Sequence, residues 1–332
     1  MKKVVLGLSG GVDSAVAAML LGRAGYDVTG LYLDIGTPTG ALEAQGVADS
    51  LGIPLVIVDI SEKLEETVCK PFVSAYLQGR TPNPCIMCNP SVKFRTLCDH
   101  ADEIGAEFVA TGHYARIREG KLLKGPASND QSYMLCRVTK EQLSRLVLPL
   151  GEYEKTEIRK MAAEMGLSVA SKPDSMEICF IPDGDYAAFI EARGEYPPEG
   201  NFVDESGAIL GIHKGIHHYT MGQRRGLGIA LGKRMFVSAL SPETNEVVLS
   251  EGDGLYVTEL RAGDVNWQQE VTAEKIPCTV RVRHSKMMTQ AAAFPDGSGV
   301  HIVFEEPVRA PTPGQSAVMY DGDTVLGGGY II

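Results

Sequence analysis

The amino-acid sequence predicts an α/β domain with a doubly wound parallel sheet, followed by two small β-rich domains. In the first half, continuous apolar segments alternate with helix-like ones, a pattern typical of parallel strands whose helices cover both faces of the sheet. A stretch rich in Pro and Gly at 194–200 is interpreted as a linker, and short alternating segments with many glycines follow it. We therefore expect domains at 1–193, 194–252 and 253–332.

The strands of the first domain are expected where short apolar runs lie between helical patterns. These strands are Lys3–Leu8, Val28–Leu33, Pro54–Ile60 and Glu107–Thr111. The helices between and around them are expected at 15–23, 41–51, 62–78 and 92–104, and Gly25, Gly52 and Gly105 are expected to end the first, second and fourth. In a sheet of this kind, ligands bind beyond the carboxyl ends of the strands, so the loops at that edge are the first candidates for a site.

The remaining elements follow from shorter patterns. Residues 114–124 form a predicted hairpin that turns at Glu119-Gly120, and helical patterns resume at 140–147 and 153–165. Beyond the linker, strands are expected at 234–240, 246–250 and 279–283, and residues 251–254 form a second predicted boundary.

Composition indicates a globular protein of the cytoplasm. The chain has 332 residues with 44% hydrophobic and 22% charged residues, which argues against disorder. No run approaches the roughly 20 apolar residues of a membrane span, and the N-terminus lacks the layout of a signal peptide, so no membrane partner is expected. Seven scattered cysteines are not the pattern of a secreted disulfide framework, so the thiols are expected to stay reduced. The net charge of −11 disfavours nucleic acid weakly, but basic patches at 221–234 and 279–292 could still bind a phosphate backbone.

The strongest chemical signal is the loop Ser9-Gly10-Gly11-Val12-Asp13-Ser14 between the first strand and the first helix. Its glycines let the backbone approach phosphate oxygens, and the hydroxyls and the helix N-terminus supply hydrogen-bond donors. Asp13 could hold a Mg²⁺ ion that bridges phosphates. Because no Lys follows, this is not the loop of enzymes that split off the γ-phosphate.

Two further segments contain cysteines that could carry chemistry. In Thr81–Asn89, Cys85 and Cys88 have a spacing that suits a metal site, a redox pair or an activated thiolate. In Lys172–Pro182, Cys179 precedes an apolar pair, and taken alone it is more often a core residue than a catalytic one. The other cysteines are interpreted as packing residues, namely Cys69, Cys98, Cys136 and Cys278. His213, His217 and His218 could suggest a metal site, but a solvated loop is the favoured interpretation.

These motifs, taken together and in order, resemble the tRNA-specific 2-thiouridylases, which belong to the ATP pyrophosphatase (PP-loop) superfamily. The resemblance rests on Ser9–Ser14, Thr81–Asn89, Ala110–Arg116, Asp174–Phe180, His218–Gly228 and Thr312–Ala317, and it covers essentially the whole chain. It implies an adenine nucleotide alpha hydrolase-like first domain and a β-barrel as the last domain. It also implies an enzyme that replaces the C2 oxygen of the wobble uridine by sulfur, in tRNAs for Lys, Glu and Gln.

The resemblance also assigns the nucleotide and sulfur chemistry. ATP would adenylate the uracil oxygen, which is otherwise a very poor leaving group, with Mg²⁺ neutralising the pyrophosphate. Cys179 would carry a persulfide, and Cys88 would release its outer sulfur by thiol–disulfide exchange. A cysteine desulfurase or a relay protein would donate the sulfur. The implied nucleotide-binding residues are Gly7, Leu8, Ser9, Gly10, Gly11, Val12, Asp13, Ser14, Leu33 and Gly112.

The implied RNA contacts come from all three domains, and the target base must be splayed out of the anticodon loop to be reached. These residues are Asn83, Pro84, Cys85, His113, Asn129, Asp130, Gln131, Arg224, Arg225, Arg281, Val282 and Gln315.

Cys85 is a departure from the family, because many of its members have Asp at this position. A carboxylate therefore cannot serve here as an acid or base. The three thiols of Cys85, Cys88 and Cys179 could instead hold a [4Fe–4S] cluster with one iron open to sulfide. The segment 34–40 is also shorter than the family implies.

Two other functions remain open on the sequence. One is a related adenylating synthetase that transfers ammonia, which would need no persulfide. The other is a regulator that binds a nucleotide or an iron–sulfur cluster without catalysis.

Overall fold

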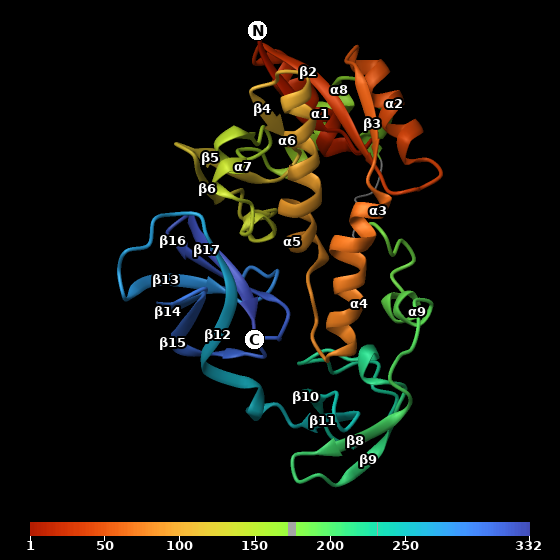
Figure 1. Cartoon of the computed structure of the whole chain (residues 1–332), viewed down its shortest axis with the longest axis vertical. Coiled ribbons are helices and arrows are strands. Elements are labelled where there is room, and N and C mark those ends of the chain that lie inside the picture. Colours follow the sequence, from red (N-terminus) through yellow and green to blue (C-terminus); the bar gives the residue numbers. More distant parts are fainter. Residues whose placement is uncertain (172–176, 231) are drawn as a thin grey trace.

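A computed structural model describes residues 1–171, 177–230 and 232–332. Residues 172–176, in the segment Lys172–Pro182, lie outside the described residues. The first part of the motif Asp174–Phe180 is therefore not described. The molecule is elongated, with the N-terminal sheet at one end, a barrel in the middle and a small sheet at the other end (Figure 1). Within the described part of the chain, no helix is both long and apolar enough to span a bilayer.

The N-terminal sheet is parallel and has the strand order β3-β2-β1-β4-β7. Its strands are β1 (Lys2–Gly7), β2 (Tyr26–Asp34), β3 (Leu55–Asp59), β4 (Phe108–Ala110) and β7 (Leu146–Val147). Central strands are buried on both faces, which explains their continuous apolar runs. The edge strand β3 differs, because Ile57 is 50% exposed there. The helix expected at 140–147 is wrong at its end, since Leu146 and Val147 pair with β4 instead.

Helices cover both faces of this sheet, so the doubly wound class is confirmed. One face packs against α1 (Val12–Arg23), α2 (Gly40–Leu51) and α8 (Lys155–Glu164). The other face packs against α6 (Phe94–Glu103) and α7 (Lys140–Arg145). A left-handed Gly52 ends α2, as the sequence pattern predicts.

The helix expected at 62–78 is present as one continuous helical run, composed of α3 (Ser61–Leu64), the π-helical η1 (Glu65–Cys69) and α4 (Lys70–Leu77). A second π-helical segment, η2 (Asn89–Lys93), follows α5 (Pro84–Cys88). Pro71 follows η1, and Pro90 lies within η2. Because a proline has no backbone N–H, each of them removes an i→i−4 hydrogen bond. Both segments therefore widen the helix beside a cysteine.

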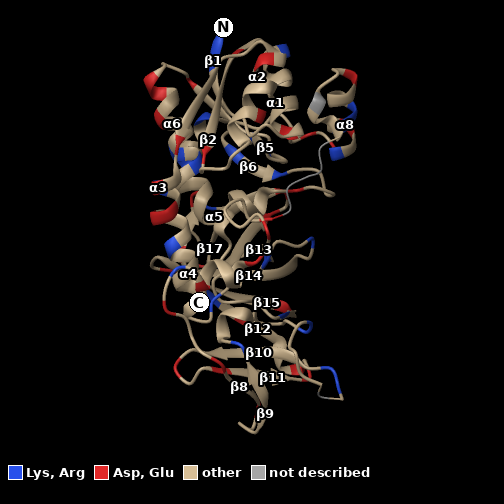
Figure 2. Ribbon diagram, turned by 90° about the vertical axis from the view of Figure 1, so that its right-hand side faces the viewer, with Lys and Arg blue, Asp and Glu red and all other residues tan. Residues whose placement is uncertain are grey.

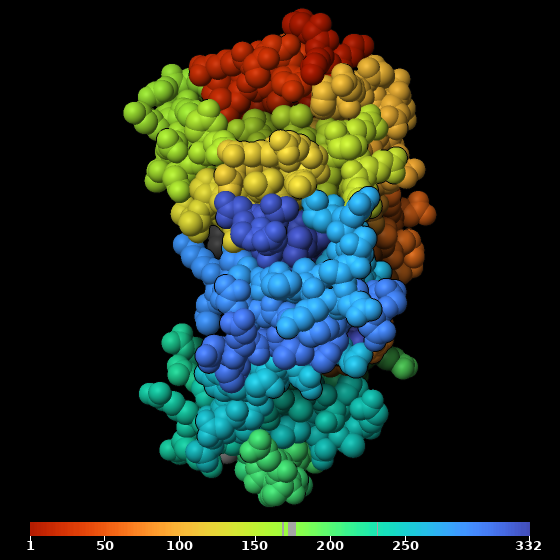
Figure 3. Space-filling view, turned by 90° about the vertical axis from the view of Figure 1, so that its left-hand side faces the viewer, coloured from red at the N-terminus to blue at the C-terminus, as the bar shows by residue number. Residues whose placement is uncertain are grey.

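The predicted hairpin is present as β5 (Ala115–Arg118) and β6 (Lys121–Lys124). Glu119 (φ 51°) and Gly120 (φ 73°) form its turn, and two positive φ values are typical of a type I′ turn. The hairpin does not join the parallel sheet. It pairs with β17 near the C-terminus, through Leu123 and Thr324, and Figure 3 shows this yellow part of the chain lying directly on the dark blue C-terminal strands.

The rest of the chain is β-rich, as predicted. One sheet of four strands has the order β10-β11-β8-β9, and six strands close into a barrel through the additional pairing of β12 with β17. The strands of the small sheet are β8 (Gly200–Asp204), β9 (Ile209–His213), β10 (Phe236–Ser241) and β11 (Glu246–Ser250). The barrel strands are β12 (Tyr256–Trp267), β13 (Ile276–Arg281), β14 (Thr289–Asp296), β15 (Gly299–Arg309), β16 (Ser316–Asp321) and β17 (Thr324–Ile331).

Short helices occupy the connections. They are η3 (Ser132–Leu135), η4 (Ser168–Ser171), α9 (Tyr186–Glu191), η5 (Ile216–His218) and η6 (Asp253–Leu255).

Candidate active site

The glycine-rich loop lies at the carboxyl edge of the parallel sheet, between β1 and α1. Gly10 has a φ of 74°, and a Cβ there would lie 2.9 Å from atoms of Glu43 and Ala44, so α2 packs directly on the loop. The Ser14 hydroxyl donates to the Gly11 carbonyl at 3.1 Å and accepts from the Ser9 N–H at 3.2 Å. These bonds fix the loop with the first-turn N–H groups of α1 directed out of the helix, the arrangement that binds phosphate.

Asp13 is held by two side chains from other parts of the first domain. The Tyr114 hydroxyl donates to one carboxylate oxygen at 2.6 Å, and the Lys155 ammonium lies 2.7 Å from both oxygens. Lys155 is the first residue of α8, which follows the short strand β7. A cation at Asp13 would therefore compete with the Lys155 ammonium, and the same ammonium is available to an anionic ligand in the loop.

Gly112 and Leu33 occupy different places around the loop. A Cβ on Gly112 would lie 3.0–3.2 Å from atoms of Asp13 and Ser14, so only a glycine allows this close approach. Leu33 is half-buried near the end of β2 and packs between two apolar clusters.

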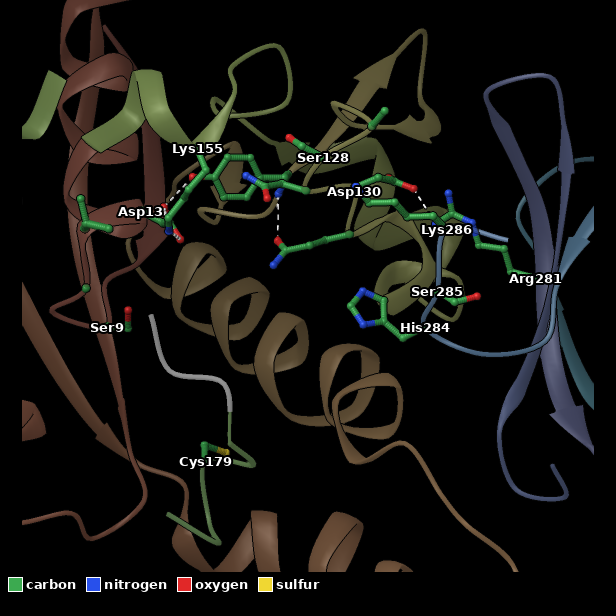
Figure 4. A pocket seen from close by; sticks show the side chains of 16 residues that line it. Ser9, Asp13, Ser128, Asp130, Lys155, Cys179, Arg281, His284, Ser285 and Lys286 are labelled. Carbon is green, nitrogen blue, oxygen red and sulfur yellow. Dashed lines mark hydrogen bonds and ion pairs between the residues drawn. The ribbon is translucent and has the colours of Figure 1, made fainter. Parts of the chain in front are cut away.

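A cavity of about 720 Å³ opens beside the loop and extends toward the barrel (Figure 4). It brings together three regions that the sequence analysis predicted separately: the glycine-rich loop, the segment Asn129–Gln131 and Cys179. Its lining residues are Ser9, Gly11, Val12, Asp13, Tyr114, Ala127, Ser128, Asn129, Asp130, Gln131, Lys155, Cys179, Arg281, His284, Ser285 and Lys286. A volume of this size suits a nucleotide-sized ligand.

Of the three candidate thiols, only Cys179 lines this cavity. Cys85 and Cys88 are three residues apart on α5, and so share a face of the helix. Cys88 and Phe180, the neighbour of Cys179, pack against the same apolar cluster around Val68 and Val92. All seven cysteines of the chain are free.

The surroundings of these thiols disfavour the thiolate. Burial, together with the nearby thiols of Cys88 and Cys85, raises the pKa of Cys179 to about 11, although the residue keeps an exposed surface. Burial also raises the pKa of Cys88. The Lys93 ammonium lowers the pKa of both thiols. A cationic or covalent partner would therefore increase their reactivity.

The segment that precedes α5 is held in place by hydrogen bonds to both β-rich parts of the chain. The Thr81 N–H donates to the Pro313 carbonyl at 2.8 Å, and the Gln315 amide donates to the Thr81 carbonyl at 2.8 Å. The Thr81 hydroxyl also donates to Thr220 at 3.2 Å. Gln315, predicted to contact RNA, is thus also a positioning residue for the cysteine helix.

Other predicted RNA residues near α5 have structural contacts of their own. The Asn83 side chain caps α5 by accepting from the Cys85 and Ile86 N–H groups, and Pro84 is buried at the start of the helix. His113 Nδ1 forms a hydrogen bond of 2.7 Å with the Thr111 hydroxyl. Burial, followed by the Lys93 charge, holds the pKa of His113 well below its usual value.

Arg281 and Asp130 form a buried ion pair across the cavity. Arg281 Nη1 lies 2.7 Å from Asp130 Oδ2, with side chains only 8% and 5% exposed. Figure 4 shows this pair bridging from the first domain to the barrel. Val282 is buried beside it.

Arg224 and Arg225 lie apart from the cavity, on an exposed loop. Figure 2 shows basic positions on the loop beside β10 and β11 and on the loop beside β13 and β14. The basic patches are therefore distributed along the molecule rather than gathered at the cavity.

The histidines do not lie in a solvated loop, so that interpretation is wrong. His213 and His217 are 1% and 0% exposed. His217 Nε2 and His218 Nε2 lie 3.2 Å and 3.1 Å from the same Glu191 oxygen, at the end of α9. His217 and His218 thus lie against the end of α9, a tertiary contact that the local sequence did not indicate.

Lys155 and Tyr114 are site residues that the sequence analysis did not identify. The signal for Lys155 was its place at the start of a helix, because helices that follow parallel strands begin at the ligand-binding edge. The preceding strand β7 has only two residues, so the pattern around it was interpreted as a helix.

Comparisons with known proteins match the whole chain. Residues 2–183 match a family model described as tRNA methyl transferase HUP domain, residues 187–251 one described as tRNA methyl transferase PRC-barrel domain, and residues 257–331 one described as Aminomethyltransferase beta-barrel domain. The tRNA-specific 2-thiouridylase MnmA of Lachnoclostridium phytofermentans is 44% identical over 357 residues, which cover 100% of both chains.

A second relative, from Clostridioides difficile, carries the same name and is 44% identical over 353 residues, covering 99% of this chain and 98% of the relative. Among solved structures, a 4-thiouridine synthetase–RNA complex with bound ATP is 20% identical over 58% of this chain and 50% of that chain, with a TM-score of 0.39.

Proposed function

This chain belongs to the tRNA-specific 2-thiouridylase family, and we propose that it activates the wobble uridine of its tRNA with ATP and replaces the C2 oxygen by sulfur. It is a tRNA-modifying sulfurtransferase that uses ATP. The observation that carries the proposal is the meeting of a phosphate-binding loop and Cys179 in one cavity. Adenylation and sulfur transfer need these two groups within reach of the same base.

The glycine-rich loop would bind the triphosphate. The α1 N-terminus and the Ser9 and Ser14 hydroxyls would hold phosphate oxygens, and Lys155 would move from Asp13 toward the anionic phosphates. Asp13 would then be free to hold the Mg²⁺ that accompanies ATP. The uridine C2 oxygen attacks the α-phosphorus, and pyrophosphate leaves. The C2–O bond is thereby prepared to break with AMP as the leaving group.

Sulfur would arrive on Cys179 as a persulfide. Its outer sulfur attacks C2, the C2–O bond breaks and AMP departs. Cys88 then attacks the inner sulfur of Cys179, so the S–S bond breaks, the outer sulfur stays on C2 and a Cys88–Cys179 disulfide forms. An external thiol returns both cysteines to the reduced state. The shared apolar cluster of Cys88 and Phe180 supports this, since it holds the two segments together.

A [4Fe–4S] cluster is the alternative way to deliver sulfur. Cys85, Cys88 and Cys179 supply three thiol ligands; Cys85 and Cys88 share a face of α5, and both raise the pKa of Cys179. The donor set therefore fits a cluster with three protein ligands. When bound, such a cluster would supply an iron that accepts sulfide. The raised pKa values mean that cluster binding must displace protons from thiols.

The RNA surface would extend from the cavity over the β-rich parts of the chain. We assign the anticodon stem-loop of tRNAs for Lys, Glu and Gln to this surface, with the target base beside Asn83, Pro84 and Cys85. Exposed Arg224 and Arg225 suit phosphate contacts. Domains at 1–193, 194–252 and 253–332 and a cysteine desulfurase or relay protein as donor complete the proposal.

Reconstitution under anaerobic conditions tests this function. Purified protein is mixed with unmodified tRNA-Lys, ATP, Mg²⁺ and either sulfide or a cysteine desulfurase with cysteine. We measure 2-thiouridine, AMP, pyrophosphate and bound iron together. Thiolation without iron that is lost in Cys179→Ser supports the persulfide route, whereas thiolation in proportion to iron supports the cluster.

The matched control is Cys98→Ser, a half-buried cysteine outside the cavity. It should leave thiolation unchanged. If wild-type protein forms no thiouridine under either condition, the proposed function is wrong, and ammonia transfer would be tested next.

A further inference from the structure

Cys179 lines two separate cavities. Besides the large cavity at the glycine-rich loop, it borders a second one of about 270 Å³. The second cavity is lined by Ile35, Thr37, Ser61, Leu64, Glu65, Cys69, Cys179, Phe180, Pro182 and Arg193. Of all these residues, only Cys179 also lines the large cavity.

The second cavity is built from the widened helix and the segment after Cys179. Ser61 and Leu64 lie on α3, and Glu65 and Cys69 lie on the π-helical η1. The π-helical turn before Pro71 therefore forms part of the cavity wall. Its volume lies just below the range of about 300–1,000 Å³ that is common for small-molecule sites. It can therefore admit the end of a side chain but not a nucleotide.

One cation is fixed at this cavity. Arg193 Nη2 lies 3.2 Å from Glu65 Oε2, and the guanidinium stacks 3.4 Å from the centre of the Phe189 ring. The stacked ring and the ion pair hold the guanidinium at the wall. The Glu65 carboxylate, which lines the same cavity, balances its charge, so the wall is polar and contributes guanidinium N–H groups as hydrogen-bond donors.

We propose that this second cavity is the binding site for the persulfide end of the sulfur donor, which reaches Cys179 from the side opposite to the nucleotide. The proposal rests on the proposed function. Nucleotide and tRNA would fill the large cavity, so a donor that used the same side would have to wait for both to leave. Two cavities that share one thiol remove this conflict.

The transfer at this site is balanced without an added oxidant. The Cys179 thiolate attacks the outer sulfur of the donor persulfide R–S–SH, the donor S–S bond breaks, and R–S⁻ leaves and takes up a proton. Cys179 then carries the persulfide, whose outer sulfur faces the large cavity. The other thiol of the wall, Cys69, is buried, and burial followed by the Glu65 charge raises its pKa to about 12.

The test blocks the second cavity and compares two sulfur sources. Ser61→Trp places an indole ring at the exposed rim of the cavity, and the control Glu62→Trp changes the adjacent exposed residue, which does not line it. Each variant is assayed for 2-thiouridine with a cysteine desulfurase and cysteine, with cysteine persulfide, and with sodium sulfide. We also measure ³⁵S bound to Cys179 in the presence of ATP and tRNA.

We expect Ser61→Trp to lower desulfurase-driven thiolation and ³⁵S labelling on the order of tenfold or more, because the donor sulfur is displaced from its attack position. Sulfide is small enough to use the large cavity, so sulfide-driven thiolation should stay near the wild-type rate, which also shows that the variant folds. If Ser61→Trp loses thiolation with cysteine persulfide as well as with the desulfurase, the cavity binds the persulfide group itself. If thiolation is lost with the desulfurase alone, the cavity binds the donor protein.

Equal rates for Ser61→Trp and Glu62→Trp with every donor would overturn the proposal, and so would an equal loss with desulfurase and sulfide. If the wild-type protein makes no thiouridine with any donor, the proposed function fails, and this site fails with it.

Discussion

Replacing Arg281 by Met should separate a structural role from an RNA-contact role. Arg281 pairs with Asp130 at 2.7 Å, and its side chain is 8% exposed. Asp130 also accepts hydrogen bonds from the Gly125 N–H, the Ser132 N–H and the Ser132 hydroxyl. The substitution removes the only ion-pair partner recorded for Asp130 among the described residues and leaves its carboxylate buried.

The expected loss of stability follows from these contacts. Two unit charges 2.7 Å apart attract by about 6 kcal/mol at an effective dielectric constant of 20. Desolvation offsets part of this, and removing one partner of a buried pair typically costs about 3–5 kcal/mol. Because three other donors still hold Asp130, we expect the lower end, about 3 kcal/mol.

Urea unfolding followed by Trp267 fluorescence measures this loss. Trp267 is the only tryptophan of the chain and lies at the end of β12, so it reports on the barrel. In Asp130→Asn/Arg281→Met the coupling between the two sites should recover a large part of the loss. The control Arg261→Met breaks an exposed pair, 61% and 72% accessible, and should cost below about 1 kcal/mol. A loss for Arg281→Met as small as the control's, with weaker tRNA binding, would refute the structural role.

Three further outcomes are expected. Lys155→Met should lower kcat/KM for ATP by about 10²–10³-fold in pyrophosphate release, because the ammonium that is proposed to hold the phosphates would be lost; an unchanged value would contradict the role of Lys155. Gly112→Ala should weaken ATP binding in equilibrium dialysis while leaving urea stability nearly unchanged, since its Cβ would press on Asp13 at 3.0–3.2 Å. Burial lowers the folded-state pKa of His113 and His213. Their contribution to stability is therefore complete above the unfolded pKa of about 6.5 and is lost as the pH falls below it. Urea unfolding curves that coincide at pH 7.5 and pH 5.5 would be inconsistent with this expectation.

Local patterns were sufficient where the chain's own chemistry decides the structure. The turn at Glu119-Gly120 and the loop before α1 were predicted because positive φ angles and close backbone approach require particular residues. The two-residue strand β7 was not predicted, because Leu146 and Val147 are too few to show a period.

Long-range contacts explain the remaining differences. Nothing near Arg281 indicates a partner at Asp130, 151 positions earlier, and nothing near His217 indicates that α9 would bury it. The hairpin was predicted, but its pairing with β17 depends on sequence more than 200 residues away. The site residues of the glycine-rich loop can thus be predicted from the sequence, whereas the distant residues that contact and position the site cannot.

The pairing of the hairpin with β17 has a consequence for the order in which the protein is made. The apolar cluster behind β4 contains Leu122 and Tyr133 from the first half together with Val318, Tyr320 and Val325 from the last strands. During synthesis the nucleotide-binding half therefore emerges with part of its core uncovered, and β16 and β17 cover it once they have left the ribosome. Full nucleotide-site stability should therefore be acquired only after β17 is released, which makes a chain without this strand a target for chaperones rather than a partly active enzyme.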